Sequence, residues 1–117
     1  MPKRILVLLI LPFVLISCKE NFLNLKIRFH QVQGLKEGNR VIFKQNHIGT
    51  VKNLFQSDED FFIVDIAIKK DFADHATEYS RFFIITDPQY KENKAVEMIQ
   101  IRSGGKLLKN NAWNNHY

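Results

Sequence analysis

The side chains best suited to acid–base or metal chemistry are scattered along this chain. None of the four histidines has a cysteine or carboxylate partner at metal-ligand spacing. Asp74 and His75 are adjacent, but neighbours on an extended chain point to opposite faces. The acidic run 58–60 lacks the alternating ligands of a calcium loop and suits a solvated turn. No nucleophile–base set is recognisable, so we expect a protein that is not an enzyme and that holds no metal or cofactor. The histidines are His30, His47, His75 and His116.

The chain begins with a segment typical of an export signal. Lys3 and Arg4 form a positively charged start, and an apolar run follows from residue 5 to residue 16. This run is shorter than the ~20 apolar residues that span a bilayer, so a secretory signal fits it better than a membrane helix. We expect residues 1–17 to be a signal peptide that is cleaved off.

Cys18 is the only cysteine in the chain, so it cannot form an internal disulfide. It follows the residues Leu-Ile-Ser, and this ending resembles the lipobox of bacterial lipoproteins, whose cysteine is lipidated and becomes the new N-terminus. We therefore expect Cys18 to carry a lipid anchor and residues 18–22 to form a short tether. The alternative is an ordinary cleaved signal with an incidental cysteine.

The composition indicates a single small domain with no nucleic-acid partner. A length of 117 residues allows one domain, and ten phenylalanines can supply its core. The formal charge is +5; without residues 1–17, 15 Lys and Arg face 12 acids, which leaves +3. The basic residues form no stripe or helix face, so nucleic acid is not an expected partner.

Residues 22–30 alternate between apolar and polar side chains, a period of two that predicts a half-buried β-strand. The short strands and intervening turns together indicate an all-β barrel or sandwich, because no stretch has a convincing amphipathic helical pattern. The further strands predicted along the chain are residues 40–44, 47–55, 61–68, 79–86, 95–102 and 106–109.

The connections between the predicted strands carry their own signals. Residues 45–46, Gln-Asn, are a candidate hairpin turn, because asparagine tolerates the left-handed region. Residues 69–76 could hold one helical turn, with Phe72 closing one end of a barrel. The asparagine-rich end of the chain is expected to fray, with residues 112–117 as a C-terminal tail.

Three of the five glycines lie between residues 34 and 54. Gly34 and Gly38 suit turns with positive φ, whereas Gly49 interrupts a strand, as glycines do at bulges and close backbone approaches. This spaced set resembles the mammalian cell entry (MCE) domain family, to which the MlaD-like lipid-transport proteins belong. The matching positions are Gly34, Leu35, Gly38, Val41, Ile48, Gly49 and Val51.

The resemblance extends over residues 23–111, nearly the whole chain after the signal. Residues 97–101 resemble the family's sixth strand, and residues 103–110 resemble the glycine turn and the leucine that follow it. A member of this family is expected to be a small seven-stranded barrel of the MCE type. The alternative is a generic β-hairpin with glycine turns.

The resemblance also implies a function. Bacterial members carry phospholipids between membranes, so a non-enzymatic lipid-transport component is expected, on the periplasmic side of the cell envelope. The implied partners are phospholipid or another lipid, the membrane that holds the anchor, an ABC-type permease and ATPase, and further copies of the chain in a hexameric ring.

The loop between the fifth and sixth strands departs from the family pattern. It is typically apolar and lines the pore of the ring, whereas residues 87–94 are polar apart from Pro88 and Tyr90. This departure keeps open a second function, that of a structural or adaptor envelope lipoprotein with an MCE-like barrel and no lipid conduit.

A small barrel fills its interior with its own core, so a lipid path must lie between subunits or along an exposed apolar edge. Alternation along a strand would bury at least one member of each adjacent apolar pair. The candidate lipid-facing residues are Phe82, Phe83, Tyr90, Leu107 and Leu108.

Overall fold

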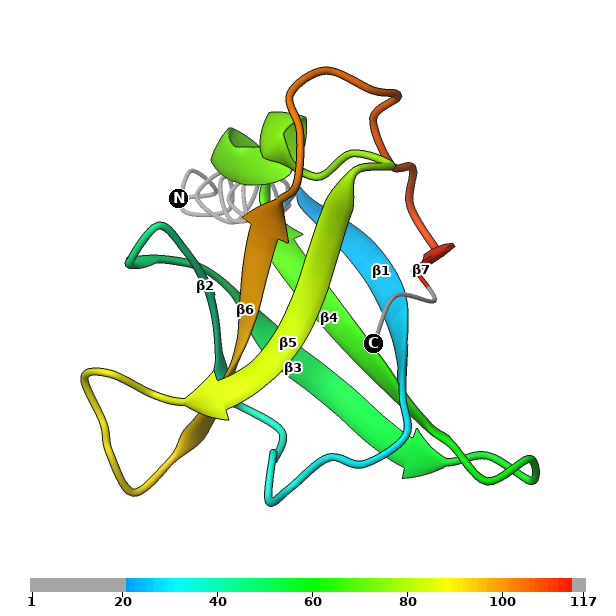
Figure 1. Ribbon diagram of the computed structural model, residues 1–117, viewed down its shortest axis with the longest axis vertical. Coiled ribbons are helices and arrows are strands. Elements are labelled where there is room, and N and C mark those ends of the chain that lie inside the picture. Colours follow the sequence, from blue (N-terminus) through cyan, green and yellow to red (C-terminus); the bar gives the residue numbers. More distant parts are fainter. Residues whose placement is uncertain (1–20, 115–117) are drawn as a thin grey trace, which may run out of the picture.

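Figure 1 shows the computed structural model of the chain, which describes residues 21–114. The described part is a seven-stranded sheet with one 3-10 helix, and the strands lie in the order β5-β6-β2-β3-β4-β1-β7. The expected all-β, seven-stranded barrel architecture is confirmed. The elements are β1 (Phe22–Phe29), β2 (Arg40–Phe43), β3 (Asn46–Gln56), β4 (Phe62–Lys69), η2 (Lys70–His75), β5 (Ser80–Thr86), β6 (Lys94–Gln100) and β7 (Ala112–Asn114).

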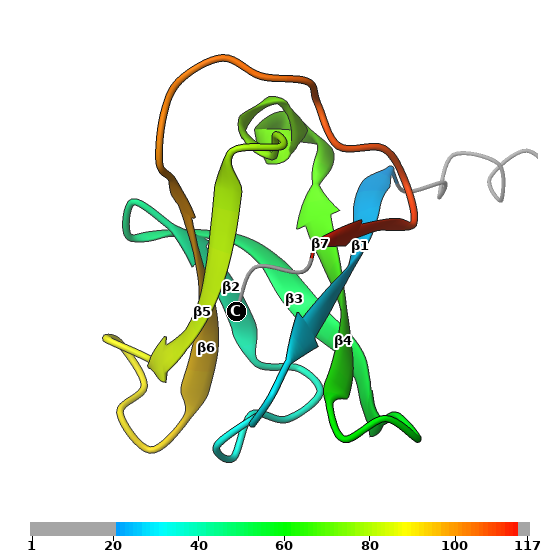
Figure 2. The ribbon, with the colours of Figure 1, turned by 45° about the vertical axis from the view of Figure 1, so that its right-hand side comes forward.

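The sheet curls into a barrel whose wall stays open between β5 and β1 (Figure 2). These two strands stand at or near opposite ends of the strand order and share no ladder within residues 21–114. One side chain crosses the gap: Asn114 Nδ2 on β7 donates to the Ser80 carbonyl on β5 over 3.2 Å. We call this opening the seam.

The barrel interior is filled by the side chains that the period of two predicts. On β1 the buried positions are Leu23, Leu25, Ile27 and Phe29, and the residues between them are exposed or half-buried. They pack with the inward residues of the other strands in one apolar cluster. Each such buried aliphatic or aromatic side chain contributes about 1.5–3 kcal/mol through the hydrophobic effect. The interior is therefore a core, as expected for a barrel of this size.

The central strand β3 is irregular at two places, which lets the sheet curl. Its register against β2 shifts after Val41, and its register against β4 shifts between Val51 and Asn53. Gly49 lies beside the first shift, and a Cβ atom there would stand 2.2 Å from the Ala67 carbonyl oxygen on β4. Only a residue without a side chain allows this backbone approach.

The other two glycines of the motif shape the loop that leads into β2. Gly34 has φ +92° and Gly38 has φ +90°, values that L residues with side chains rarely adopt. The Gly38 N–H donates to the Val51 carbonyl over 2.8 Å, and Val51 donates back to Asn39 over 2.8 Å. The turn thus extends the β2–β3 pairing, and it places Leu35 in the core.

The hairpin turn between β2 and β3 lies one residue earlier than the sequence predicted. Phe43 pairs with Asn46, so the turn residues are Lys44 and Gln45, with φ of 50° and 70°. Positive φ at both positions is typical of the type I′ hairpin turn, whose twist matches that of the flanking strands. Asn46, expected in the turn, is instead the first residue of β3.

The prediction of a last strand at residues 106–109 is wrong. Leu107 forms only an isolated bridge with Thr77, because Gly104 and Gly105 both have positive φ and turn the chain across the end of the barrel. The last strand is β7, which runs parallel to β1. Residues 112–114, assigned from the sequence to a fraying tail, therefore belong to the sheet.

The connection between β4 and β5 contains the expected helical turn, η2, and Phe72 is half-buried there against the core. Figure 1 shows η2 at one end of the barrel and the β5–β6 loop at the other end. Within residues 21–114, no helix has the length and apolar character needed to cross a membrane.

We expect Gly49→Ala to lower the free energy of unfolding by about 2–3 kcal/mol, because the methyl group would overlap the Ala67 carbonyl. Urea unfolding followed by circular dichroism measures it. Gly38→Ala is the matched control, since no atom lies within 4 Å of its added Cβ and only the positive φ opposes it, at about 1 kcal/mol. Equal losses in the two variants would contradict the close approach.

We expect Gln45→Gly to raise the free energy of unfolding by about 0.5–1 kcal/mol, because glycine removes the strain of φ 70°. Gln56→Gly, at the end of β3, is the control; its φ is not positive, so glycine there should cost about 0.5–1 kcal/mol. A loss of stability in Gln45→Gly would show that the turn residue is not strained.

Candidate functional site

The loop between β5 and β6, residues 87–93, is held to the barrel by an ion pair whose carboxylate is buried. Asp87 follows β5 directly, and its side chain is 1% exposed. Arg40, the first residue of β2, donates to it twice, from Nε to Oδ2 over 2.8 Å and from Nη2 to Oδ1 over 2.7 Å. This two-bonded geometry is the strongest arrangement available to an arginine and a carboxylate, and it fixes the loop against β2.

The same carboxylate organises the loop itself. Asp87 Oδ1 also accepts the backbone N–H groups of Gln89 over 2.8 Å and Tyr90 over 3.2 Å. The loop then closes, because Asp87 N–H donates to the Asn93 carbonyl over 2.9 Å. Proline at position 88 has no N–H to continue the ladder, so the Asp-Pro pair ends β5 and begins the turn.

The electrostatics of the pair follow from these bonds. The hydrogen bond from Arg40 holds the pKa of the Asp87 carboxyl well below its usual range; burial opposes this shift, and the Gln89 and Tyr90 N–H donors reinforce it. The pKa of Arg40 is raised, chiefly by the same hydrogen bond. Both groups are therefore charged at neutral pH. Removing Arg40 would leave the buried Asp87 carboxylate without its counter-charge, and removing Asp87 would leave the half-buried Arg40 without its own.

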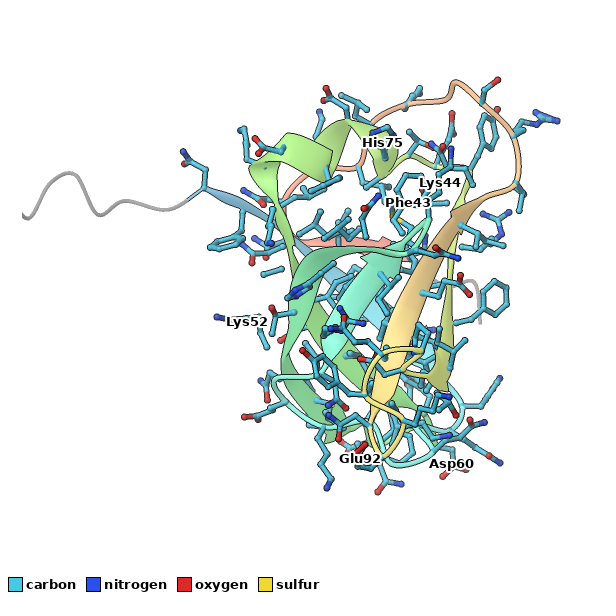
Figure 3. The ribbon with its side chains drawn as sticks, turned by 90° about the vertical axis from the view of Figure 1, so that its left-hand side faces the viewer. Phe43, Lys44, Lys52, Asp60, His75 and Glu92 are labelled. Carbon is cyan, nitrogen blue, oxygen red and sulfur yellow. The ribbon has the colours of Figure 1, made fainter. Side chains whose placement is uncertain are left out.

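The outward side of the loop is polar, as the sequence indicated. Lys91, Glu92 and Asn93 are exposed, and Figure 3 shows Glu92 at the end of the barrel opposite His75 and Lys44. Tyr90 is 48% exposed, and the Arg40 guanidinium lies 5.2 Å from its ring centre. Tyr90 is thus an accessible apolar surface whose position is set by the ion pair.

Two grooves flank this region. One, of about 620 Å³, lies between the loop and the outer face of β2, β5 and β6; its lining combines apolar Ile42 and Ile85 with charged Arg40 and Glu97. The other, of about 300 Å³, lies at the seam between the end of β1 and β5, and Phe83 and Ile84 contribute to it. Linings that combine apolar walls with a few polar groups are typical of ligand-binding surfaces.

The structure does not gather the five candidate lipid-facing residues in one place. Phe82 is fully buried in the core, so its assignment to a lipid-facing surface is wrong, and Leu108 is half-buried against the core. Phe83 and Leu107 are 43% and 54% exposed. Leu107 lies beside Phe22 and η2, at the end of the barrel remote from the β5–β6 loop. Alternation on β5 explains why only one of its two adjacent phenylalanines faces outward.

The motif residues lie in the strands of the barrel and in the turn that leads into β2. Val41, Ile48 and Val51 are core residues, Leu35 is buried beneath the loop it belongs to, and Gly49 contacts the backbone of β4. Gly34 and Gly38 are exposed turn residues. None of them lines either groove.

Sequence reasoning missed the Arg40–Asp87 pair. The only signal was an Asp-Pro pair directly after a predicted strand. Such a pair indicates a turn but does not show which residue Asp87 binds. Fold topology supplies the partner, since β2 pairs with β6 in parallel and so brings Arg40 beside the start of the loop.

The groups considered for catalysis or metal binding remain apart. Within residues 21–114, no group of three or more His, Cys, Asp or Glu residues is placed to hold a metal ion. His75 lies against the Phe43 ring, with centres 5.1 Å apart, and the acidic run 58–60 is an exposed turn. Cys18 and residues 1–17 lie outside the described residues.

We expect Asp87→Asn to lower the free energy of unfolding at pH 7 by about 2–4 kcal/mol, because it leaves Arg40 without its counter-charge. Glu92→Gln, an exposed loop carboxylate, is the control and should change stability by less than about 0.5 kcal/mol.

The pH profile of unfolding provides a second test. Because the pKa of Asp87 is lower in the folded than in the unfolded chain, its contribution is fully present above about pH 5 and declines as the pH falls below about 4. Asp87→Asn should remove that part of the acid dependence. An unchanged profile would contradict the role of the pair.

Comparison with known proteins places the chain in a family. Residues 22–104 match the model of the MlaD protein family. No curated protein sequence matches the chain. Among solved structures, a chain of the Acinetobacter MlaFEDB complex in its ATP-bound Vtrans1 conformation shares the fold, with a TM-score of 0.67 and 13% identity, over 96% of this chain and 86% of that one. The match spans most of the barrel, and the protein belongs to the MlaD family of MCE domains.

Proposed function

We propose that this chain is a non-enzymatic MCE-domain lipoprotein that forms a ring and binds substrate in an ABC-type phospholipid transport system of the bacterial envelope. The MlaD family match over residues 22–104 carries the proposal. The shared fold with a chain of the MlaFEDB complex, solved in an ATP-bound state, supports partners of the permease and ATPase type.

The packing of the barrel limits where lipid could bind. The core cluster fills the interior, so an acyl chain has to lie on an outer surface or between copies of the chain. Phe83, Tyr90 and the groove beside Ile85 are the exposed apolar features near the loop. In a ring, surfaces of this kind from neighbouring copies would shield a lipid from water.

The proposed anchor gives the barrel an orientation. β1 begins at Phe22, which pairs with Lys69 beside η2. A lipid on Cys18 would be joined to Phe22 by a tether whose extended reach is about 14 Å. The η2 end would then face the anchoring membrane and the 87–93 loop would point away from it, towards the periplasm (Figure 1).

A second candidate function is an envelope adaptor without a lipid conduit. The polar, rigidly held 87–93 loop favours it, because Lys91 and Glu92 would place charges where an apolar pore lining is needed. An adaptor of this kind would bind protein partners and no lipid.

Native mass spectrometry of the full chain, extracted in detergent, tests between these functions. Lipid transport predicts an oligomer that retains phospholipid in a fixed ratio to protein. A strict monomer with no retained phospholipid would contradict the proposal, and protein partners recovered by crosslinking without lipid would favour the adaptor.

Metabolic labelling with a palmitate analogue tests the anchor. We expect label and membrane association in the wild type and in Lys19→Ala, and the loss of both in Cys18→Ala. Label that persists in Cys18→Ala would disprove the anchor at this residue.

A further inference from the structure

One side of the barrel carries an exposed aromatic cluster around an arginine. Across the outward face, Phe55 on β3, Ile63 on β4 and Arg28 on β1 are register partners in one row. Trp113 on β7 and Phe61 border the row, and Phe55 and Trp113 are 44% and 46% exposed. We call this set the Arg28 patch: Arg28, Phe55, Phe61, Ile63 and Trp113.

Arg28 is held between aromatic rings instead of pairing with an acid. Its guanidinium carbon lies 4.2 Å from the Phe61 ring centre and 5.5 Å from that of Trp113. Its Nε is buried without a hydrogen-bond partner, and no carboxylate within residues 21–114 forms an ion pair with it. The nearby Lys26 is neutralised by Asp65 over 3.1 Å. Arg28 therefore carries a positive charge that no carboxylate of the described residues neutralises, and the rings of Phe61 and Trp113 fix its orientation.

The opposite side of the barrel carries the complementary charge. Phe83 on β5 pairs with Glu97 on β6, and Ile85 and Ile99 lie on the same outward face. Phe83 and Ile99 are 43% and 36% exposed. We call this set the Glu97 patch: Phe83, Ile85, Glu97 and Ile99.

Glu97 is half-buried, and no cation within the described residues forms an ion pair with it. The adjacent Arg81 is engaged elsewhere, because its Nη1 donates to the carbonyls of Glu78 and Ser80. Grooves of about 620 and 330 Å³ both reach Glu97. This face is hollowed around a carboxylate, whereas the Arg28 patch projects aromatic rings around a guanidinium.

We propose that the Arg28 patch of one copy packs on the Glu97 patch of the next copy, head to tail, with Arg28 opposite Glu97. The inference rests on the proposed ring-forming function and names the surfaces that build the ring. Figure 2 shows β5 and β6 on one side of the barrel and β4 and β1 on the other. Two different, complementary patches on opposite sides generate a chain of copies that closes into a ring when the rotation permits.

The chemistry favours a second copy over other occupants of these faces. A symmetric, face-to-face dimer would place Arg28 against Arg28, which like-charge repulsion disfavours. Tryptophan, phenylalanine and arginine gathered in one exposed patch match the composition of residues that dominate protein interfaces. Glu97 of the next copy would also give Arg28 a counter-charge, which no carboxylate within residues 21–114 supplies.

Reversing the charges tests the pairing in the full-length protein. Arg28→Glu and Glu97→Arg are each expected to weaken association by at least about tenfold, because each places like charges in the interface. The double variant should assemble as the wild type does. Oligomer masses by native mass spectrometry and association constants by analytical ultracentrifugation are the readouts.

Mixing the two single variants in equal amounts gives a sharper test. In an alternating head-to-tail ring, every contact between an Arg28→Glu copy and a Glu97→Arg copy places opposite charges together. We expect assembly to return, with both variants in equal numbers. A mixture that stays dissociated although both variants are folded, or single variants that assemble as the wild type does, would overturn the proposal.

Matched reversals outside both patches serve as controls. Lys52→Glu and Glu92→Arg change the charge by the same amount at exposed positions that Figure 3 shows projecting from the barrel, and neither should affect assembly. Circular dichroism checks the fold of each variant. If Arg28→Glu does not fold, Arg28→Gln and Glu97→Gln form a double-mutant cycle, in which additive effects on association would overturn the pairing.

The test separates this interface from the function on which it rests. If the protein retains phospholipid and both charge-reversal variants assemble as the wild type does, the proposed interface is wrong and the lipid function still stands. Rescue by the mixture without bound phospholipid would establish the interface and remove the lipid function. A monomeric wild type would overturn the interface.

Discussion

The close contact between the backbones of β3 and β4 at Gly49 is the constraint on which the barrel depends. β3 is the middle strand of the sheet, so its curvature decides whether the strands on either side wrap around one core. Gly49 lies next to a register shift and leaves no room for a Cβ atom against the Ala67 carbonyl. Irregularities of this kind increase local twist and bend the strand, and they turn a flat sheet into a curled one.

The Arg40–Asp87 ion pair has the corresponding role for the loop at the end of the barrel. One carboxylate serves the arginine and two backbone N–H groups, so a polar loop is held in a single shape without an apolar core of its own. A buried pair is costly to desolvate, and its value lies in specifying one arrangement of the surrounding chain. Here that arrangement fixes the position of the exposed Tyr90 ring and forms one wall of the larger groove.

The interior of the barrel is occupied by its core, so the features available for interaction all lie on the outside. They differ from face to face: projecting aromatic rings around Arg28, hollows around Glu97, and a polar loop at the end remote from the start of β1. Two faces that differ in shape and in charge suit a subunit that packs against further copies of itself through unlike surfaces. The chain belongs to the MlaD family, and within residues 21–114 no group of three or more His, Cys, Asp or Glu residues is placed to hold a metal ion.

The sequence by itself determined the local features: the alternation that buries one face of β1, the glycines at turns, and the family, through the spacing of residues 34–51. These features depend on residues that are close together in the sequence, so the sequence alone is enough to predict them. The tertiary structure decided the contacts between residues that lie far apart in the sequence. It placed β7 beside β1, joined Arg40 to Asp87, and divided Phe82 from Phe83 between core and surface. A sequence read in order cannot supply such partners, because strand order and register bring them together only when the sheet closes.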